Sequence, residues 1–183
     1  MIYRAIAIIC LLAATAGAQT SRPATDFPRG LWSLTLEGAY AHSFDLSPAR
    51  IETASMGVGY YFMDNLSLNA EAAGFWVQQS GPDSRIAEIN LLLRHHLLNY
   101  GRLSILIDVG GGLSYASVPT PPGGTYFNFC LQTGPGVSFR LTDSLHLIGG
   151  ARYLHFSNAA IEGTIHNPSI NVLEGYLGVM YTF

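Results

Sequence analysis

The feature of this sequence that most limits its fold is a series of eight segments in which apolar and polar residues alternate. A period of two is the pattern of a β-strand, because successive side chains point to opposite faces of the sheet. Each segment has about ten residues or more, which is long enough for a tilted strand to cross a bilayer. Turn-forming residues bound the segments, which are residues 31–43, 51–62, 66–77, 85–97, 102–115, 126–141, 144–157 and 171–183.

The composition indicates where these strands lie. Charged residues make up only 11% of the chain and the mean hydropathy is +0.26, yet no segment after the first 18 residues resembles a transmembrane helix. A transmembrane barrel gives this combination, because only every second residue of its strands faces lipid. The sequence therefore predicts an all-β protein, an eight-stranded antiparallel transmembrane β-barrel.

The polar faces of the segments predict the interior of this barrel. They carry small residues together with acids and arginines, which suits a narrow lumen filled by side chains rather than an ion-conducting pore. The residues expected to form an interior polar network are Glu37, Glu71, Glu88, Arg94, Arg102, Asp108, Arg140 and Arg152.

The ends of the chain predict its organisation. Residues 1–18 combine an early Arg4, a short apolar run and the small-residue sequence Ala16-Gly17-Ala18, which is typical of a cleaved signal peptide. A short periplasmic lead-in, 19–30, precedes a single barrel domain, 31–183. Cys130 is the one cysteine left after cleavage, so no internal disulfide can form. A net charge of −3 gives no indication of nucleic-acid binding.

The connections between the segments predict the orientation of the barrel. The turns near residues 63–65, 98–101 and 142–143 are short, whereas the connections 44–50, 78–84, 116–125 and 158–170 are longer. Outer-membrane barrels place short turns in the periplasm and longer loops outside the cell. We therefore expect an outer-membrane location, with the end of the seventh segment on the extracellular side.

The seventh segment contains the residues that indicate chemistry. His155 and Ser157 are two residues apart, so both point to the same face, and they continue the apolar series that begins with Leu145 and Leu147. An imidazole beside a hydroxyl is the minimum arrangement for an activated serine nucleophile. His-x-Ser is also a common spacing, and the other interpretation is a pair of polar residues hydrated by lipid headgroups at a strand end.

A longer motif favours the first interpretation. The string from Arg152 to Ala159, Arg-Tyr-Leu-His-Phe-Ser-Asn-Ala, is followed by Asn167-Pro168-Ser169-Ile170-Asn171 and an alternating strand that ends at Phe183. This pattern resembles the lipid A 3-O-deacylase family of outer-membrane enzymes, which are often described as acyloxyacyl hydrolases. The close match covers roughly the last 30 residues, and the strand pattern agrees over the rest of the barrel.

The resemblance implies an ester hydrolase that removes an acyl chain from lipid A, the membrane anchor of lipopolysaccharide. The nucleophile falls on Ser157 and the general base on His155. Asn158 and the backbone N–H groups of residues 158–160 are the candidates for stabilising the oxyanion. No metal-ligand set is apparent, and the implied mechanism needs no cofactor.

The residue that orients His155 is where this chain departs from the family pattern, which places a Glu on the last strand. The matching position is Asn171, which shares the face of His155 and Ser157. An Asn can accept the ring N–H but cannot stabilise imidazolium by charge. Glu174 is the alternative, although its parity directs it to the lumen unless a bulge turns it outward, and Glu162 in the following loop is a weaker candidate.

Two other kinds of protein fit the same strand pattern. A non-enzymatic barrel of the adhesin or membrane-stability type needs no His–Ser pair on its lipid-facing side. A palmitoyltransferase-like barrel needs an acyl pocket in the lumen, and the polar, arginine-rich interior argues against that.

Overall fold

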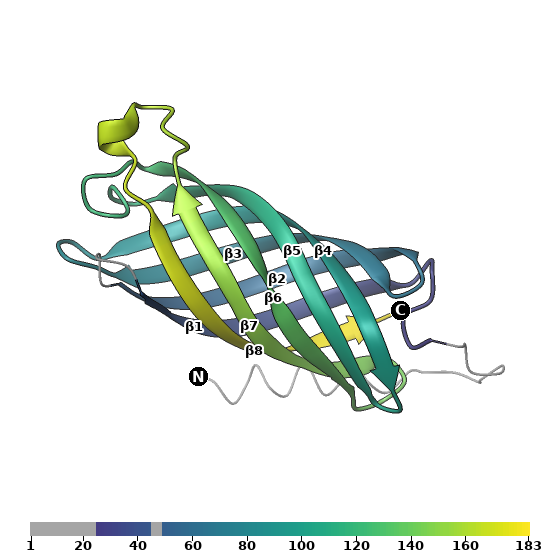
Figure 1. Cartoon of the computed structure of the whole chain (residues 1–183). Helices are drawn as coiled ribbons and strands as arrows, with labels where there is room; N and C mark the ends of the chain where they lie inside the picture. The colour runs from purple at the N-terminus through teal and green to yellow at the C-terminus, as the bar shows by residue number, and fades with distance from the viewer. Residues whose placement is uncertain (1–24, 45–48) are drawn as a thin grey trace.

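The computed structural model describes residues 25–44 and 49–183, so the predicted signal peptide 1–18 and the first part of the lead-in lie outside the described residues. Eight antiparallel strands pair in sequence order and β1 pairs with β8, which closes the sheet into a barrel (Figure 1). The predicted fold is confirmed, and every segment bound agrees within three residues. The strands are β1 (Trp32–Ser43), β2 (Arg50–Met63), β3 (Leu66–Gln78), β4 (Ser84–Tyr100), β5 (Leu103–Ala116), β6 (Phe127–Arg140), β7 (Leu145–Ser157) and β8 (Ile170–Thr182).

The side chains of the strands divide between two surfaces, as the alternation requires. Apolar residues cover the outer wall, where Ile89 is 65% exposed and Leu131 is 60% exposed, whereas polar residues fill the lumen, where Arg94 is 1% exposed. A soluble protein would bury the apolar face, so this inverted arrangement requires lipid around the wall. Among the described residues, no helix is long and apolar enough to cross a membrane.

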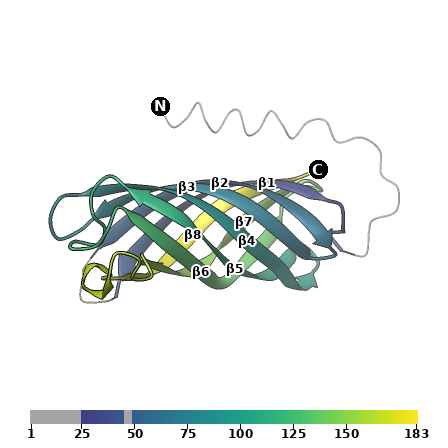
Figure 2. The ribbon, with the colours of Figure 1, turned by 90° about the horizontal axis from the view of Figure 1, so that it is seen from above.

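The strands are tilted relative to the barrel axis (Figure 2), and their pairing register gives the size of this tilt. We follow the paired residues around the barrel from Ser157 on β7, through β6 and β5 and then the remaining strands. The row returns to β7 at Leu147, ten residues before Ser157. An offset of ten over eight strands corresponds to a tilt of about 40°. A path that follows the paired residues around the wall therefore changes its depth in the membrane.

The lumen is closed by an ionic network at its centre. Asp108 accepts from Arg94 at 2.8 Å and from Arg152 at 2.9 Å, and Glu37 lies 3.2 Å from Arg94 and 2.9 Å from Arg152. The guanidinium of Arg152 also stacks over the Tyr176 ring, 4.0 Å from its centroid. Two arginines thus balance two acids in a space without room for a pore.

Other residues expected in this network lie elsewhere or bond differently. Glu71 and Glu88 are buried in the lumen, and Glu88 accepts from the Asn90 amide. Arg102 is exposed in the turn before β5, because the turn interrupts the alternation, so its prediction was wrong. Arg140 lies at the same end of the barrel and pairs with Asp26 at 3.0 Å.

The described part of the lead-in enters the barrel at the end that carries the short turns, which we call the turn end. Phe27 is 1% exposed and stacks on the His96 ring at a centroid distance of 3.5 Å. The His96 ring is hydrogen-bonded on both sides, through Nε2 to the Tyr61 hydroxyl at 3.0 Å and through Nδ1 to Ser104 Oγ at 2.8 Å. The lead-in therefore contributes to the core of the barrel.

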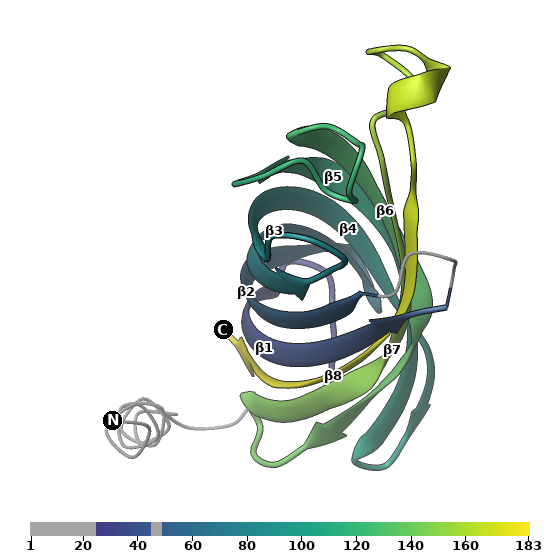
Figure 3. The same cartoon turned by 90° about the vertical axis from the view of Figure 1, so that its left-hand side faces the viewer.

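The opposite end, which we call the loop end, carries the longer connections (Figure 3). The connection between β7 and β8 projects beyond the rim and contains a short 3₁₀-helix, η2 (Thr164–His166). β7 runs from the turn end to the loop end, so His155 and Ser157 lie near the loop end.

Candidate active site

His155 and Ser157 meet on the outer wall of the barrel, where both are half-buried. The His155 Nε2 atom lies 3.1 Å from the Ser157 Oγ atom. On the other side of the ring, the Nδ1 atom lies 2.8 Å from the Asn171 Oδ1 atom. An amide oxygen can only accept, so this contact places the ring proton on Nδ1 and leaves Nε2 free to accept the serine proton.

Asn171 is brought to His155 by the pairing of β7 with β8, in which these two residues are directly opposite each other. The Asn171 oxygen also accepts from the hydroxyl of Tyr153 at 2.6 Å, and its amide nitrogen lies 3.5 Å from the Ser169 Oγ atom. Sequence reasoning did not single out Tyr153, although its parity places it on the face of His155. All these side chains are neutral, apart from the proton that His155 can gain.

Glu174, the alternative orienting residue, lies on the other side of the sheet. It is 3% exposed in the lumen, pairs in register with Arg152 and accepts from Thr53 Oγ1 at 2.9 Å. The pairing of β7 with β8 runs without a register shift, so no bulge turns it outward. Glu162 is exposed in the loop that follows β7, with no hydrogen bond to His155 among the described residues.

The side chain of Asn158, a candidate oxyanion donor, points to the lumen and is 3% exposed. Its amide group donates to the His166 carbonyl at 2.7 Å and to Thr125 Oγ1 at 3.1 Å, so both hydrogens are already used. The assignment of this side chain is therefore corrected: it anchors the loop after β7. The reason is parity, because the alternation of β7 continues for one residue beyond Ser157.

The backbone after Asn158 offers a different donor. Ala159 and Ala160 have φ values of 51° and 60°, a left-handed conformation that residues with a side chain rarely adopt. The N–H groups of Asn158 and Ala160 bond to Asn167 Oδ1 and Asn158 Oδ1. Among the described residues, the Ala159 N–H group has no such partner, which leaves it as the available donor of this turn.

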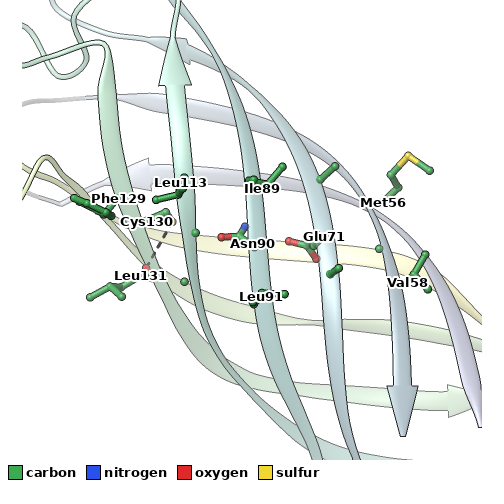
Figure 4. Close-up of a pocket in the computed structure, with 15 residues that line it drawn as sticks. Met56, Val58, Glu71, Ile89, Asn90, Leu91, Leu113, Phe129, Cys130 and Leu131 are labelled. Atoms are coloured by element: carbon green, nitrogen blue, oxygen red, sulfur yellow. Dashed lines mark hydrogen bonds between the residues drawn. The ribbon is translucent and has the colours of Figure 1, made fainter. Parts of the chain in front are cut away.

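An apolar groove of about 880 Å³ crosses the outer wall (Figure 4). Two neighbouring rows of paired residues line the groove, and the alanines and glycine within these rows form its floor. One row runs through Phe129, Leu113, Ile89, Ala72 and Met56, and the other through Leu131, Gly111, Leu91, Ala70 and Val58. Ser157 pairs with Phe129 and His155 pairs with Leu131, so the two site residues continue the two rows.

The groove descends into the membrane as it leaves the site. The row that starts at Ser157 returns to β7 ten residues closer to the turn end, so each step from β6 toward β2 lies deeper. Over the four steps from Phe129 to Met56 the groove extends about 19 Å. This depression could not be read from the sequence, because it depends on which residues are paired across strands.

The fold and this site define a class: outer-membrane β-barrels whose wall carries a hydrogen-bonded Ser–His pair. Within that class a family profile described as lipid A 3-O-deacylase (PagL) matches residues 57–180, about two thirds of the chain. The chain belongs to the lipid A 3-O-deacylase family. No curated protein matches it in sequence.

Solved structures with the same fold include barrels of different kinds. The chain is similar to Neisserial surface protein A (TM-score 0.58, 19% identity, 83% of this chain and 94% of that chain). It is also similar to OprG from Pseudomonas aeruginosa (TM-score 0.57, 12% identity, 87% of this chain and 99% of that chain). The outer membrane enzyme PagL is a third similar structure (TM-score 0.54, 15% identity, 80% of this chain and 98% of that chain). At these identities the likeness concerns the fold alone.

No three His, Cys, Asp or Glu side chains of residues 25–44 and 49–183 come together as a metal site.

Proposed function

We propose that this chain is a serine esterase of the outer membrane that hydrolyses the ester-linked acyl chain at position 3 of lipid A. The observation that carries the proposal is the continuous set of hydrogen bonds from Ser157 through His155 to Asn171, on a lipid-facing wall beside an apolar groove. A lipid substrate reaches such a site from within the outer leaflet, without passing through the lumen or the loops.

The reaction follows from the positions of the protons. Ser157 Oγ attacks the ester carbonyl while its proton passes to His155 Nε2, and the Nδ1–H group donates to Asn171. The carbonyl oxygen becomes an oxyanion, for which the Ala159 N–H group is the proposed donor. His155 then gives its proton to the departing sugar oxygen, which leaves an acyl group on Ser157. Water loses a proton to His155 and attacks this acyl group. His155 then returns the proton to Ser157 Oγ as the bond to the acyl group breaks and the fatty acid leaves.

The groove supplies the place for the acyl chain. It begins at Phe129 and Leu131, directly beside Ser157 and His155, and leads toward the membrane interior. An ester held at Ser157 therefore has its sugar toward the extracellular boundary and its acyl chain along the wall. This division matches the two ends of a glycolipid.

The test is to incubate the purified barrel with lipopolysaccharide and to detect the loss of one hydroxyacyl chain by mass spectrometry. Ser157→Ala and His155→Ala should each lower the release at least about a thousandfold. Ser114→Ala is the matched control, because Ser114 is buried in the lumen, away from His155. Equal release by the wild type and both site variants would contradict the mechanism. No release by any of them, where a known deacylase is active, would favour the non-enzymatic barrel.

A further inference from the structure

The Asn171 side-chain oxygen receives two hydrogen bonds. His155 Nδ1 lies at 2.8 Å and the Tyr153 hydroxyl at 2.6 Å from the same atom. A carbonyl oxygen has two lone pairs and can accept both donors at once. Tyr153 is therefore in direct contact with the residue that orients the general base, without being in contact with Ser157 itself.

An asparagine at this position carries a risk that a carboxylate does not. A carboxylate presents an acceptor in either orientation, whereas an amide turned by 180° presents its NH₂ group. The reversed amide would donate to Nδ1 of His155, and the ring proton would then be on Nε2, facing Ser157. In that tautomer the imidazole cannot accept the serine proton, and replacing the orienting Asp of a serine protease by Asn in this way lowers kcat about 10⁴-fold.

Tyr153 distinguishes the two amide orientations. In the observed orientation its hydroxyl proton is donated to Asn171. In the reversed orientation the phenol oxygen could accept from the NH₂ group, but its own proton would lose its acceptor. Among the described residues, Tyr153 has no second hydrogen-bond partner, and its ring lies 6.1 Å from that of Phe44.

The position of Tyr153 on the lipid-facing wall makes it unfavourable for its hydroxyl to lose the Asn171 oxygen as acceptor. Tyr153 lies four residues closer to the turn end than Ser157, which is about 10 Å deeper along the barrel axis. Its partner across β8 is Leu173, which is 58% exposed to the lipid side. A hydroxyl without an acceptor in such surroundings reduces the population of a state by about fivefold to a hundredfold.

We propose that Tyr153 is a positioning residue that keeps the Asn171 oxygen turned toward His155 and thereby selects the reactive tautomer. The inference rests on the proposed esterase function and adds to it. By fixing the amide orientation, Tyr153 lets the neutral Asn171 always present an acceptor to His155, which is one of two properties that a carboxylate has. It does not supply the other property, the negative charge that stabilises imidazolium.

The kinetic test compares Tyr153→Phe in two backgrounds. In the wild type we expect kcat for acyl release to fall about three- to tenfold at unchanged KM, because reversed amides become populated. In the Asn171→Asp background, where no NH₂ group exists, the same change should have less than about a twofold effect. Tyr40→Phe, on the outward face of β1, is the control for losing a wall hydroxyl. Equal losses in both backgrounds would mean that Tyr153 only packs, and would overturn the proposal.

A second measurement does not depend on activity. The ¹⁵N NMR signals of the His155 ring should report a proton on Nδ1 in the Ser157→Ala protein, and a larger fraction on Nε2 after Tyr153→Phe is added. An unchanged tautomer would overturn the role of Tyr153, even if acyl release is absent. A shifted tautomer in a protein without acyl release would support Tyr153 while contradicting the esterase function.

Discussion

The ionic network of the lumen and the site on the outer wall both depend on β7, whose alternate residues enter one or the other. Arg152 points inward to Asp108 and Glu37, whereas Tyr153 and His155 point outward to Asn171. The ionic network uses two acids and two arginines whose formal charges balance, whereas the site on the wall uses neutral hydrogen-bonding groups. A charge on the lipid face costs about 2–4 kcal/mol at mid-membrane and less near the boundary. The comparison teaches that the surroundings on each side of the sheet, a polar lumen or lipid, decide whether a polar side chain can be charged.

This difference gives a physical reason for Asn171 in place of an acid. A neutral amide avoids a permanent charge on the wall while still accepting the hydrogen bond from the Nδ1–H group of His155. The reaction then lacks the attraction that a carboxylate offers to imidazolium. We therefore expect a slower hydrolase than one with an acid at this position. In return, the wall avoids the free-energy cost of a charged side chain facing lipid.

The largest effect is expected from the lumen, where Asp108→Asn removes the charge shared by Arg94 and Arg152. Breaking a buried ionic network by removing one partner costs about 3–5 kcal/mol of unfolding free energy. Urea titration of the barrel in lipid vesicles, followed by tryptophan fluorescence, measures this loss. Ser157→Ala is the control and should unfold like the wild type. If Asp108→Asn does so as well, the network does not determine stability and the contrast between the two surfaces fails.

An intermediate effect is expected from the groove. Ala70→Leu fills its floor while keeping an apolar residue on the wall. Because surrounding lipid is as apolar as the groove, its contribution is shape rather than hydrophobic free energy. We therefore expect about a three- to tenfold loss of activity on long acyl chains relative to short ones. Competition between two lipid substrates, followed by mass spectrometry, gives this ratio.

The matched control for the groove is Ala54→Leu on β2, which faces outward but does not line the groove. It should leave the ratio of long to short chains unchanged. A similar change in both variants would mean that the bulk of the wall, and not the groove, affects the acyl chain.

The smallest effect is expected from Glu174→Gln. Its side chain is in the lumen and glutamine keeps an oxygen that can accept from Thr53. Acyl release should change by less than about twofold, because this side chain is outside hydrogen-bond reach of His155. A loss as large as that of His155→Ala would show that Glu174 orients the base, and would remove the distinction between the lumen and the wall.

The parity of the strands determined most of what could be predicted from the sequence. It placed Asn171 beside His155 and Glu174 in the lumen, and the structure has both there. Parity gave the wrong result for Arg102, which lies in a turn. For Asn158 parity holds, because the alternation of β7 continues into the lumen, and the assignment of this side chain as an oxyanion donor overlooked it.

Contacts between distant segments could not be predicted. Asn158 bonds to Thr125, 33 residues earlier in the chain, and Phe27 of the lead-in stacks on His96. The groove likewise depends on the offset of ten residues around the barrel, which no single segment encodes. Such features arise from pairing register and loop packing, so a periodicity within one strand does not contain them.

The outward position of Ser157 also has a kinetic consequence. A site that opens onto the wall exchanges its ligands with molecules diffusing in the plane of the leaflet. The relevant concentration is then a surface density, the number of ester-bearing lipids per unit area, and not an amount per volume of suspension. For the proposed esterase, both products form in the same leaflet as the barrel, so they compete with the next substrate for the wall.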